Sequence, residues 1–151
     1  MKNKNTNDLE LKTVEESFEA LRNASVNLNT ASDALGGTVA VLNDRLKQLN
    51  LGVSFWFTWV VTQTGGRAIG YSKVGNKWGL AIKQFRNDGE EVWAFNEAPR
   101  WMRIEAVKFL PHLLEAGVTR SEETCRELTR AETIVALVSE QLVYEENKKR
   151  K

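Results

Sequence analysis

Hydrophobic residues in the first fifty positions recur at alternating intervals of three and four, which places them on one stripe of an α-helix. The stripe consists of Leu11, Val14, Phe18, Leu21, Ser25, Leu28, Ser32, Leu35, Val39, Leu42, Leu46 and Leu49. Only its two serines are polar. The pattern predicts a long heptad helix over residues 9–50. Such a helix would be roughly 55–60 Å long at about 1.5 Å per residue, longer than a small domain is wide, so we expect it to pack on another chain.

Two adjacent glycines, Gly36 and Gly37, lie off this stripe. Each glycine costs roughly 1 kcal/mol in a helix interior, so the helix is expected to kink or divide there, or to continue at that cost. If it divides, the two halves would fold against the rest of the same chain. Both arrangements stay open from the sequence.

Residues 52–95 change to the period of two that is typical of strands, beginning with the alternation from Val53 to Val61. Glycine-rich turns, among them Gly75-Asn76, separate four such segments, expected at 53–62, 67–74, 77–85 and 91–95. The connections are too short for a parallel crossover, so the pattern predicts a four-stranded antiparallel meander.

One patch of the predicted sheet is made of small residues. Gly70, Gly79 and Ala81 fall on adjacent strands. Such a patch admits the close approach of a ligand or of another backbone. It also accommodates bulky neighbours such as Trp78 and Tyr71, and the sequence does not decide between these two uses.

Residues 97–146 are predicted to be helical. Asn96 is a candidate cap, Pro99 suits the first helical turn, and Pro111 must kink the helix or begin a new one.

A second break is expected at Gly117, followed by a capping box at Thr119 and Glu122 that would open the last helix. This helix carries its own seam, which could lie along the first helix. The seam consists of Leu128, Ala131, Val135, Val138 and Leu142. Together the elements predict a single α+β domain over residues 1–151, with residues 1–8 and 147–151 frayed.

Composition narrows the class of protein. With 21 basic and 20 acidic residues among 151, the net charge of +1 gives no general attraction to nucleic acid or anionic membranes. One cysteine, Cys125, excludes an intrachain disulfide, and one histidine, His112, argues against a histidine metal site. No apolar run approaches the roughly 20 residues that span a bilayer. We expect a cytoplasmic protein without cofactor or membrane contact.

The sequence does not match the motifs that are typical of catalytic sites. His112 follows Pro111 in an apolar helical context, with no aspartate near it in sequence and no Gly-x-Ser-x-Gly elbow in the chain. Cys125 is expected to be a buried structural thiol. The glycines between Gly65 and Gly70 lead into a strand and lack the Lys-Ser/Thr ending of a phosphate loop. The sequence therefore predicts a protein that is not an enzyme.

Arginines near aromatic residues are the more promising candidates for binding. Two arginines lie at the start of a predicted helix, a position that favours anions, and a second pair lies one turn apart on the last helix. The candidate ligand-binding residues are Arg67, Trp93, Asn96, Arg100, Arg103, Arg126 and Arg130. Alternatively, these arginines pair with surface glutamates, at about 0.2–0.5 kcal/mol for each pair.

The order of parts resembles a known family. An N-terminal helix, a meander containing the sequence Gly-Tyr-Ser-Lys-Val-Gly-Asn-Lys-Trp-Gly-Leu over residues 70–80, and a C-terminal helical part with arginines resemble phage anti-defence sponges. Those proteins sequester cyclic ADP-ribose isomers made by the Thoeris system. The resemblance implies a homodimer or larger oligomer in the host cytoplasm that binds a nucleotide without cleaving it. It also implies an aromatic residue such as Trp93 and an asparagine such as Asn96 on the base, and arginines on the phosphates.

Three functions follow as hypotheses. The first is a homo-oligomeric protein that sequesters a small phosphorylated nucleotide such as a cyclic ADP-ribose isomer. The second is a coiled-coil structural or interaction module of phage or bacterial origin, without a small ligand. The third, less favoured, is a single-stranded nucleic-acid binder that uses the sheet aromatics and the basic tail over residues 148–151. A basic helix end also complements the helix dipole, which is the simpler explanation of that tail.

Overall fold

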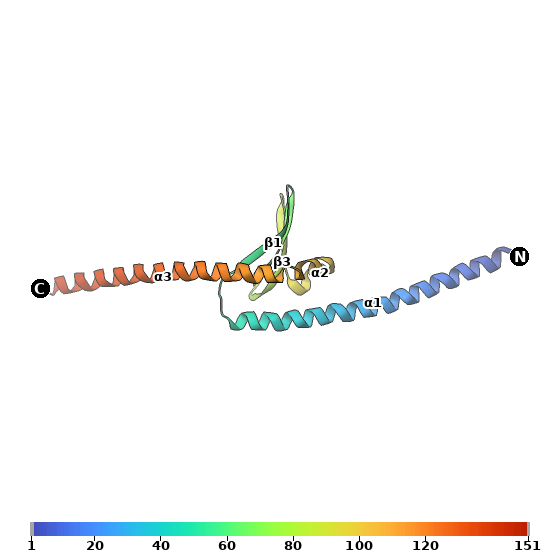
Figure 1. The fold of residues 1–151 in the computed structure, drawn as a ribbon, viewed down its shortest axis with the longest axis horizontal. Helices are drawn as coiled ribbons and strands as arrows, with labels where there is room; N and C mark the ends of the chain where they lie inside the picture. Colours follow the sequence, from blue (N-terminus) through green and yellow to red (C-terminus); the bar gives the residue numbers. More distant parts are fainter. Residues whose placement is uncertain (1, 151) are drawn as a thin grey trace. The chain divides into compact units, whose positions relative to one another are not determined.

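The computed structural model describes residues 2–150, and contacts group the chain into two units, residues 1–42 and 43–151. One long helix, a four-stranded antiparallel sheet and C-terminal helices follow in that order, which confirms the predicted α+β class (Figure 1). Unit 1 is a stretch of a single helix without a core of its own. The expectation of one domain over residues 1–151 therefore stays a prediction.

Helix α1 (Lys2–Gln48) is one continuous helix of 47 residues. It passes through Gly36 and Gly37 without a break, so of the two arrangements that the sequence left open the structure has the continuous helix. A cost of roughly 1 kcal/mol for each glycine is small against the cooperativity of the turns on either side. The helix also begins earlier than predicted, since residues expected to fray are helical. After it, Asn50 takes a positive φ of 51°, which turns the chain out of the helix.

The sheet is the predicted meander. Strands β1 (Phe55–Thr62), β2 (Gly65–Val74), β3 (Lys77–Arg86) and β4 (Gly89–Ala94) lie in the order β1-β2-β3-β4, and each neighbouring pair is antiparallel. Strands β2 and β4 each begin two residues before the prediction. Their first residues, Gly65 and Gly89, have φ values of 156° and 152° and belong to the strands, not to the turns.

A β-bulge interrupts the pairing of β1 with β2. Thr58 lies opposite Ala68 and Val60 lies opposite Arg67, so Trp59 is the extra residue. A bulge re-aims the side chain that it carries and increases the local twist. This irregularity cannot be read from the alternating sequence, and it decides where the indole of Trp59 lies.

Helix α3 (Leu110–Lys149) differs most from expectation. It runs without interruption through Gly117, so the predicted stop at Gly117 and the capping box at Thr119 are wrong. The Thr119 hydroxyl donates to the Glu115 carbonyl within the helix, at 3.3 Å. The glycine has a packing role instead, because a Cβ at Gly117 would lie 2.7 Å from the ring of Phe55.

Two shorter helices follow β4 and precede α3 along the chain. A 3₁₀ turn, η1 (Phe95–Glu97), contains Asn96, and the N-cap of α2 (Arg100–Val107) is Pro99. The predicted cap at Asn96 is therefore wrong. Pro111 lies in the first turn of α3. The sequence predicted that this proline kinks a helix or begins a new one, and in the structure it begins a new one. A proline is tolerated there because the first amides of a helix have no intrahelical partner.

One face of the sheet packs against α2 and α3. This packing forms the core of the second unit, residues 43–151, which we call the sheet unit. Phe57 stacks on Phe109 and His112, at ring-centre distances of 5.8 and 4.9 Å. Both helices lie beside the sheet in Figure 1. The buried core of the sheet unit consists of Leu46, Phe55, Ala68, Ile69, Tyr71, Leu80, Ala81, Ile82, Phe95, Ala98, Met102, Ala106 and Leu113.

Near the end of α1, a side chain supplies a hydrogen-bond acceptor to the part of β3 that β4 does not pair with. Strand β4 pairs with β3 only as far as Ala81, so the Leu80 amide has no strand partner on that side. The side chain of Asn43 supplies one, because its Oδ1 accepts a hydrogen bond from the Leu80 amide at 2.8 Å. The same side chain lies 3.2 Å from where a Cβ of Gly79 would be. Asn43 therefore fixes the end of α1 to the sheet.

Candidate functional site

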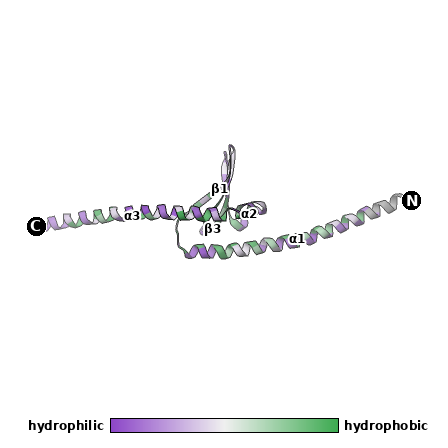
Figure 2. Cartoon of the chain, in the orientation of Figure 1, coloured by the Kyte–Doolittle hydropathy of each residue, from purple (hydrophilic) through white to green (hydrophobic). Residues whose placement is uncertain are grey.

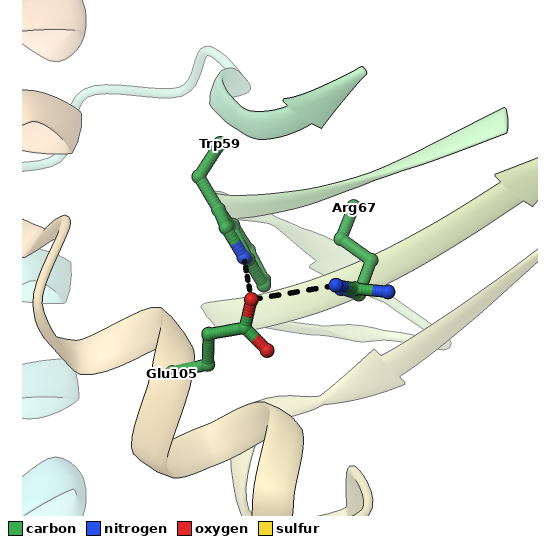
Figure 3. Close-up of polar contacts among 3 residues, drawn as sticks. All are labelled: Trp59, Arg67 and Glu105. Carbon is green, nitrogen blue, oxygen red and sulfur yellow. Dashed lines mark hydrogen bonds and ion pairs between the residues drawn. The ribbon is translucent and has the colours of Figure 1, made fainter. Parts of the chain in front are cut away.

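A charged cluster joins the bulged strand to α2. The Trp59 indole Nε1–H donates to Glu105 Oε1 at 2.9 Å, and Arg67 Nη2 donates to the same oxygen at 3.4 Å (Figure 3). The Arg67 guanidinium also lies 5.1 Å from the ring centre of Trp101, a cation–π distance. The side chains of Arg67 and Glu105 are 24% and 32% exposed. One carboxylate oxygen thus ties β1 and β2 to α2.

This cluster changes the expected role of Arg67. The sequence predicts that Arg67 holds phosphate, but Glu105 already opposes its charge. An incoming phosphate would compete with that carboxylate for the guanidinium. Arg67 Nε is buried and has no hydrogen-bond partner, so the guanidinium has unused donor capacity. An arginine paired with a glutamate is the alternative that the sequence left open, and Arg67 with Glu105 is such a pair. Sequence analysis missed the part played by Trp59, because the bulge that aims its indole leaves no sequence signal.

Four other predicted residues lie on consecutive elements of the sheet unit. Trp93 is half-buried on β4, opposite Ile82, and Asn96 is exposed in η1. On α2, Arg100 is exposed and Arg103 is half-buried. Asn96, Arg100 and Arg103 each interact with another group. The structure therefore brings this part of the predicted site to one end of the sheet.

The second arginine pair lies elsewhere. Arg126 and Arg130 are exposed on α3, 16 and 20 residues after Leu110. At about 1.5 Å per residue, Arg126 lies roughly 24 Å along the axis from the start of the helix. Figure 1 shows α3 running on beyond the sheet in this direction. A ligand held by both arginine pairs would therefore need two chains.

The small-residue patch is filled from within the chain. A Cβ at Gly70 would lie 2.2 Å from the ring of Trp56, so that indole lies directly over the glycine. The ammonium group of Lys83 lies over the same indole, with its Nζ 4.2 Å from the Trp56 ring centre. Of the two uses left open by the sequence, the patch accommodates a bulky neighbour, although the neighbour is Trp56 and not the residues expected.

A hollow of about 330 Å³ lies where the end of α1 meets the β2–β3 turn. Its walls combine two lysines, two asparagines and two aromatic rings. The rings of Tyr71 and Trp78 are stacked, with centres 5.5 Å apart. The lining residues are Lys47, Asn50, Leu51, Gly52, Tyr71, Asn76, Lys77 and Trp78. Its volume is at the lower end of the roughly 300–1,000 Å³ of small-molecule sites.

A second hollow, of about 210 Å³, lies at the β1–β2 end of the sheet and includes Arg67. Thr62 and Thr64 line it together with Arg86. The Thr62 hydroxyl already accepts from the Thr64 amide and contacts its hydroxyl, so part of this polar lining is satisfied within the turn. The hollow is smaller and lacks an aromatic wall other than Phe85.

The described residues contain no cluster of side chains that could hold a metal ion. Across residues 2–150, no three His, Cys, Asp or Glu side chains meet as a metal ion would require. No helix in that range is both long and apolar enough to cross a membrane. Cys125 is an exposed free thiol, so the expected burial of this residue is wrong. It lies on the part of α3 that extends beyond the sheet, where nothing in the sheet unit covers it.

Exposed apolar side chains recur along the two helical seams. On α1, the seam residues Leu11, Val14, Phe18, Leu21 and Leu28 are between 48% and 64% exposed. On α3, Leu128, Val135, Val138 and Leu142 are between 54% and 65% exposed. Hydrophobic positions recur along both helices in Figure 2. Contiguous apolar surface of this kind marks an interaction site.

No protein-family model, curated protein or solved structure matches this chain, so the resemblance to anti-defence sponges stays a prediction.

Proposed function

We propose that this protein is a non-enzymatic, homo-oligomeric interaction module that associates through its long helices. The exposed seam of α1 supports the proposal most strongly. Full burial of a leucine or phenylalanine side chain contributes about 1.5–3 kcal/mol, and five such residues lie more than two-fifths exposed on one stripe. A helix of 47 residues with this stripe gains its stability from packing and not from propensity.

The seam favours a second copy of the same helix as the partner. Its d positions from Leu21 onward, which include Leu28 and Leu35, are leucines, a choice that suits two-stranded coiled coils. Between Ser17 and Thr38 the flanking e and g positions carry one charge, Arg22, which already pairs with Glu19 at 3.2 Å. No like-charge pair therefore opposes self-association over these turns.

The test is the oligomeric state of two charge variants, measured by sedimentation. Leu21→Lys places an ammonium group in the seam, whereas Asn23→Lys places the same group on the opposite face of α1. We expect at least tenfold weaker association for Leu21→Lys, because a lysine in the seam must be desolvated, and unchanged association for Asn23→Lys. A wild-type chain that is monomeric at micromolar concentrations, or equal behaviour of the two variants, would overturn the proposal.

A second candidate function is the binding of a small phosphorylated nucleotide, as expected of a sponge. The 330 Å³ hollow favours it, because an indole face, two amides and two ammonium groups are the groups that bind a base and a phosphate. These residues replace the arginines predicted from sequence as the first ones to test. The hollow lies entirely within the sheet unit.

Native mass spectrometry with a panel of cyclic nucleotides and cyclic ADP-ribose isomers tests this candidate. Lys77→Ala is expected to weaken binding of the retained compound at least tenfold. Lys73→Ala removes a lysine of the same hairpin that does not line the hollow and should leave binding unchanged. Loss of binding in Arg100→Ala instead would restore the site predicted from sequence. Release of a chemically altered ligand would identify an enzyme.

A further inference from the structure

The part of α3 beyond the sheet, residues 125–148, carries a heptad seam and charges that distinguish between two ways of pairing. Assigning Leu128 to position a places Ala131, Val138 and Glu145 at d, and Val135 and Leu142 at a. All residues of α3 from Cys125 onward are exposed, up to the end of the described chain at residue 150.

Parallel pairing of two copies is unfavourable for this sequence. Equivalent d positions meet across a parallel pair, so Glu145 of one copy would face Glu145 of the other inside the seam. The g position Glu127 would face the e position Glu132 of its partner, which adds a second like-charge contact on each side. Two alanines at position 131 would also meet and leave a gap where larger side chains should fill the interface.

Antiparallel pairing removes each of these conflicts. Position a of one helix then faces d of the other, so Val135 lies opposite Val138 at the centre and Ala131 lies opposite Leu142 in the next layer. A small side chain thus meets a large one, which is how well-packed layers are filled. The two Glu145 side chains separate to opposite ends of the interface, where each lies opposite Leu128 of the other copy and next to solvent.

The flanking charges agree with the same arrangement. In an antiparallel pair, g positions face g positions, which sets Glu127 opposite Lys148 twice, by symmetry. Glu127 also lies 3.7 Å from Arg120 of its own helix, but an exposed pair of this kind contributes at most about 1 kcal/mol. Ile134, at the next g position, is 61% exposed and would add apolar area to the interface.

We propose that the α3 segments of two copies pack antiparallel through Leu128, Ala131, Val135, Val138 and Leu142. This inference deepens the proposed function, because it rests on self-association and names the partner and direction of a second helix. It does not depend on the seam of α1, whose test uses different residues.

The native thiol makes the direction measurable. In the antiparallel pair, the e position Cys125 faces the e position 146 of the partner, so Glu146→Cys in the full chain should give a disulfide-linked dimer under mild oxidation. Within one helix, 21 residues separate these positions by roughly 32 Å, far beyond the Cα separation of about 7 Å that a disulfide tolerates. Any such bond therefore joins two chains.

A second reporter detects the opposite direction. In a parallel pair, Cys125 would face the g position 120 of its partner, so Arg120→Cys should cross-link there and not in the antiparallel pair. The control Cys125→Ser in the Glu146→Cys chain should abolish the dimer. We expect at least tenfold more dimer from Glu146→Cys than from Arg120→Cys.

The remaining outcomes separate the two proposals. Preferential cross-linking of Arg120→Cys would overturn the antiparallel arrangement. Absence of both dimers from a chain that sediments as an oligomer would overturn the α3 interface and leave the proposed function standing. Absence of both from a monomeric chain would overturn both proposals.

Discussion

Gly117→Ala adds one methyl group at the point where α3 crosses β1. In an exposed helix interior this substitution stabilises by about 1 kcal/mol, because alanine has the higher helix propensity. Here the new Cβ would lie 2.7, 2.8 and 3.1 Å from three atoms of the Phe55 ring. Carbon atoms pack at about 3.5–4.0 Å, so the ring or the helix must move.

The surroundings of Phe55 set the magnitude. The residue is 6% exposed, and its ring centre is 5.6 Å from that of Tyr71, which leaves the ring little free space. Overpacking a buried site costs about 1–3 kcal/mol, so after the gain in propensity we expect a net loss of about 0–2 kcal/mol. For a chain of this size that corresponds to a melting temperature lower by up to about 8 °C.

A matched substitution separates the two effects. A Cβ at Gly37 in α1 would meet nothing within 4 Å, so Gly37→Ala has the same propensity gain without the overlap. Thermal unfolding followed by circular dichroism should therefore show Gly117→Ala below wild type and Gly37→Ala at or above it. In a Phe55→Leu background, the cost of Gly117→Ala should fall. A stabilised Gly117→Ala chain would refute the close approach of β1 to α3.

Three further substitutions test the sheet unit. Asn43→Ala leaves the Leu80 amide without its acceptor and should destabilise by about 1–3 kcal/mol, with faster hydrogen exchange at that amide. Gly70→Ala should lower the urea midpoint by displacing the Trp56 ring from the sheet, and an unchanged tryptophan emission would argue against that contact. Burial raises the pKa of Tyr71 above its ordinary value of 10.0. The unfolded chain therefore loses this proton first, so stability should fall as the pH rises above 10.0, and less steeply in Tyr71→Phe.

The sequence predicts regular elements well where one physical signal dominates. The period of two and the glycine turns define the four strands, and the heptad spacing defines α1. Gly117 shows the limit of such reading, because a glycine that ends a helix and a glycine that admits a neighbouring ring look the same without tertiary contacts. Asn96 shows it again, since a 3₁₀ turn and Pro99 precede α2 in place of the expected cap.

The candidate site was harder to predict than the fold. Arginines near aromatic residues are visible in the sequence, but their partners are set by a bulge at Trp59 that turns its indole toward Glu105. The 330 Å³ hollow joins residues 47–52, at and after the end of α1, to residues 71–78 around the β2–β3 turn. Neither relation follows from local propensity, because both depend on how separate elements meet.

The buried core of the sheet unit and the exposed seams of the helices are expected to unfold differently. The sheet unit encloses buried side chains such as Ile69, Leu80 and Leu113, so we expect this core to stay folded without a partner. The seams of α1 and of the part of α3 beyond the sheet, residues 125–148, are exposed. A helix without tertiary packing is only marginally stable in water. If these seams are covered by other copies, association stabilises the helices by mass action. Dilution should then lower the melting temperature of the helical signal while the tryptophan signal of the sheet stays constant. Helix melting that does not depend on concentration would mean that the seams gain nothing from a second copy.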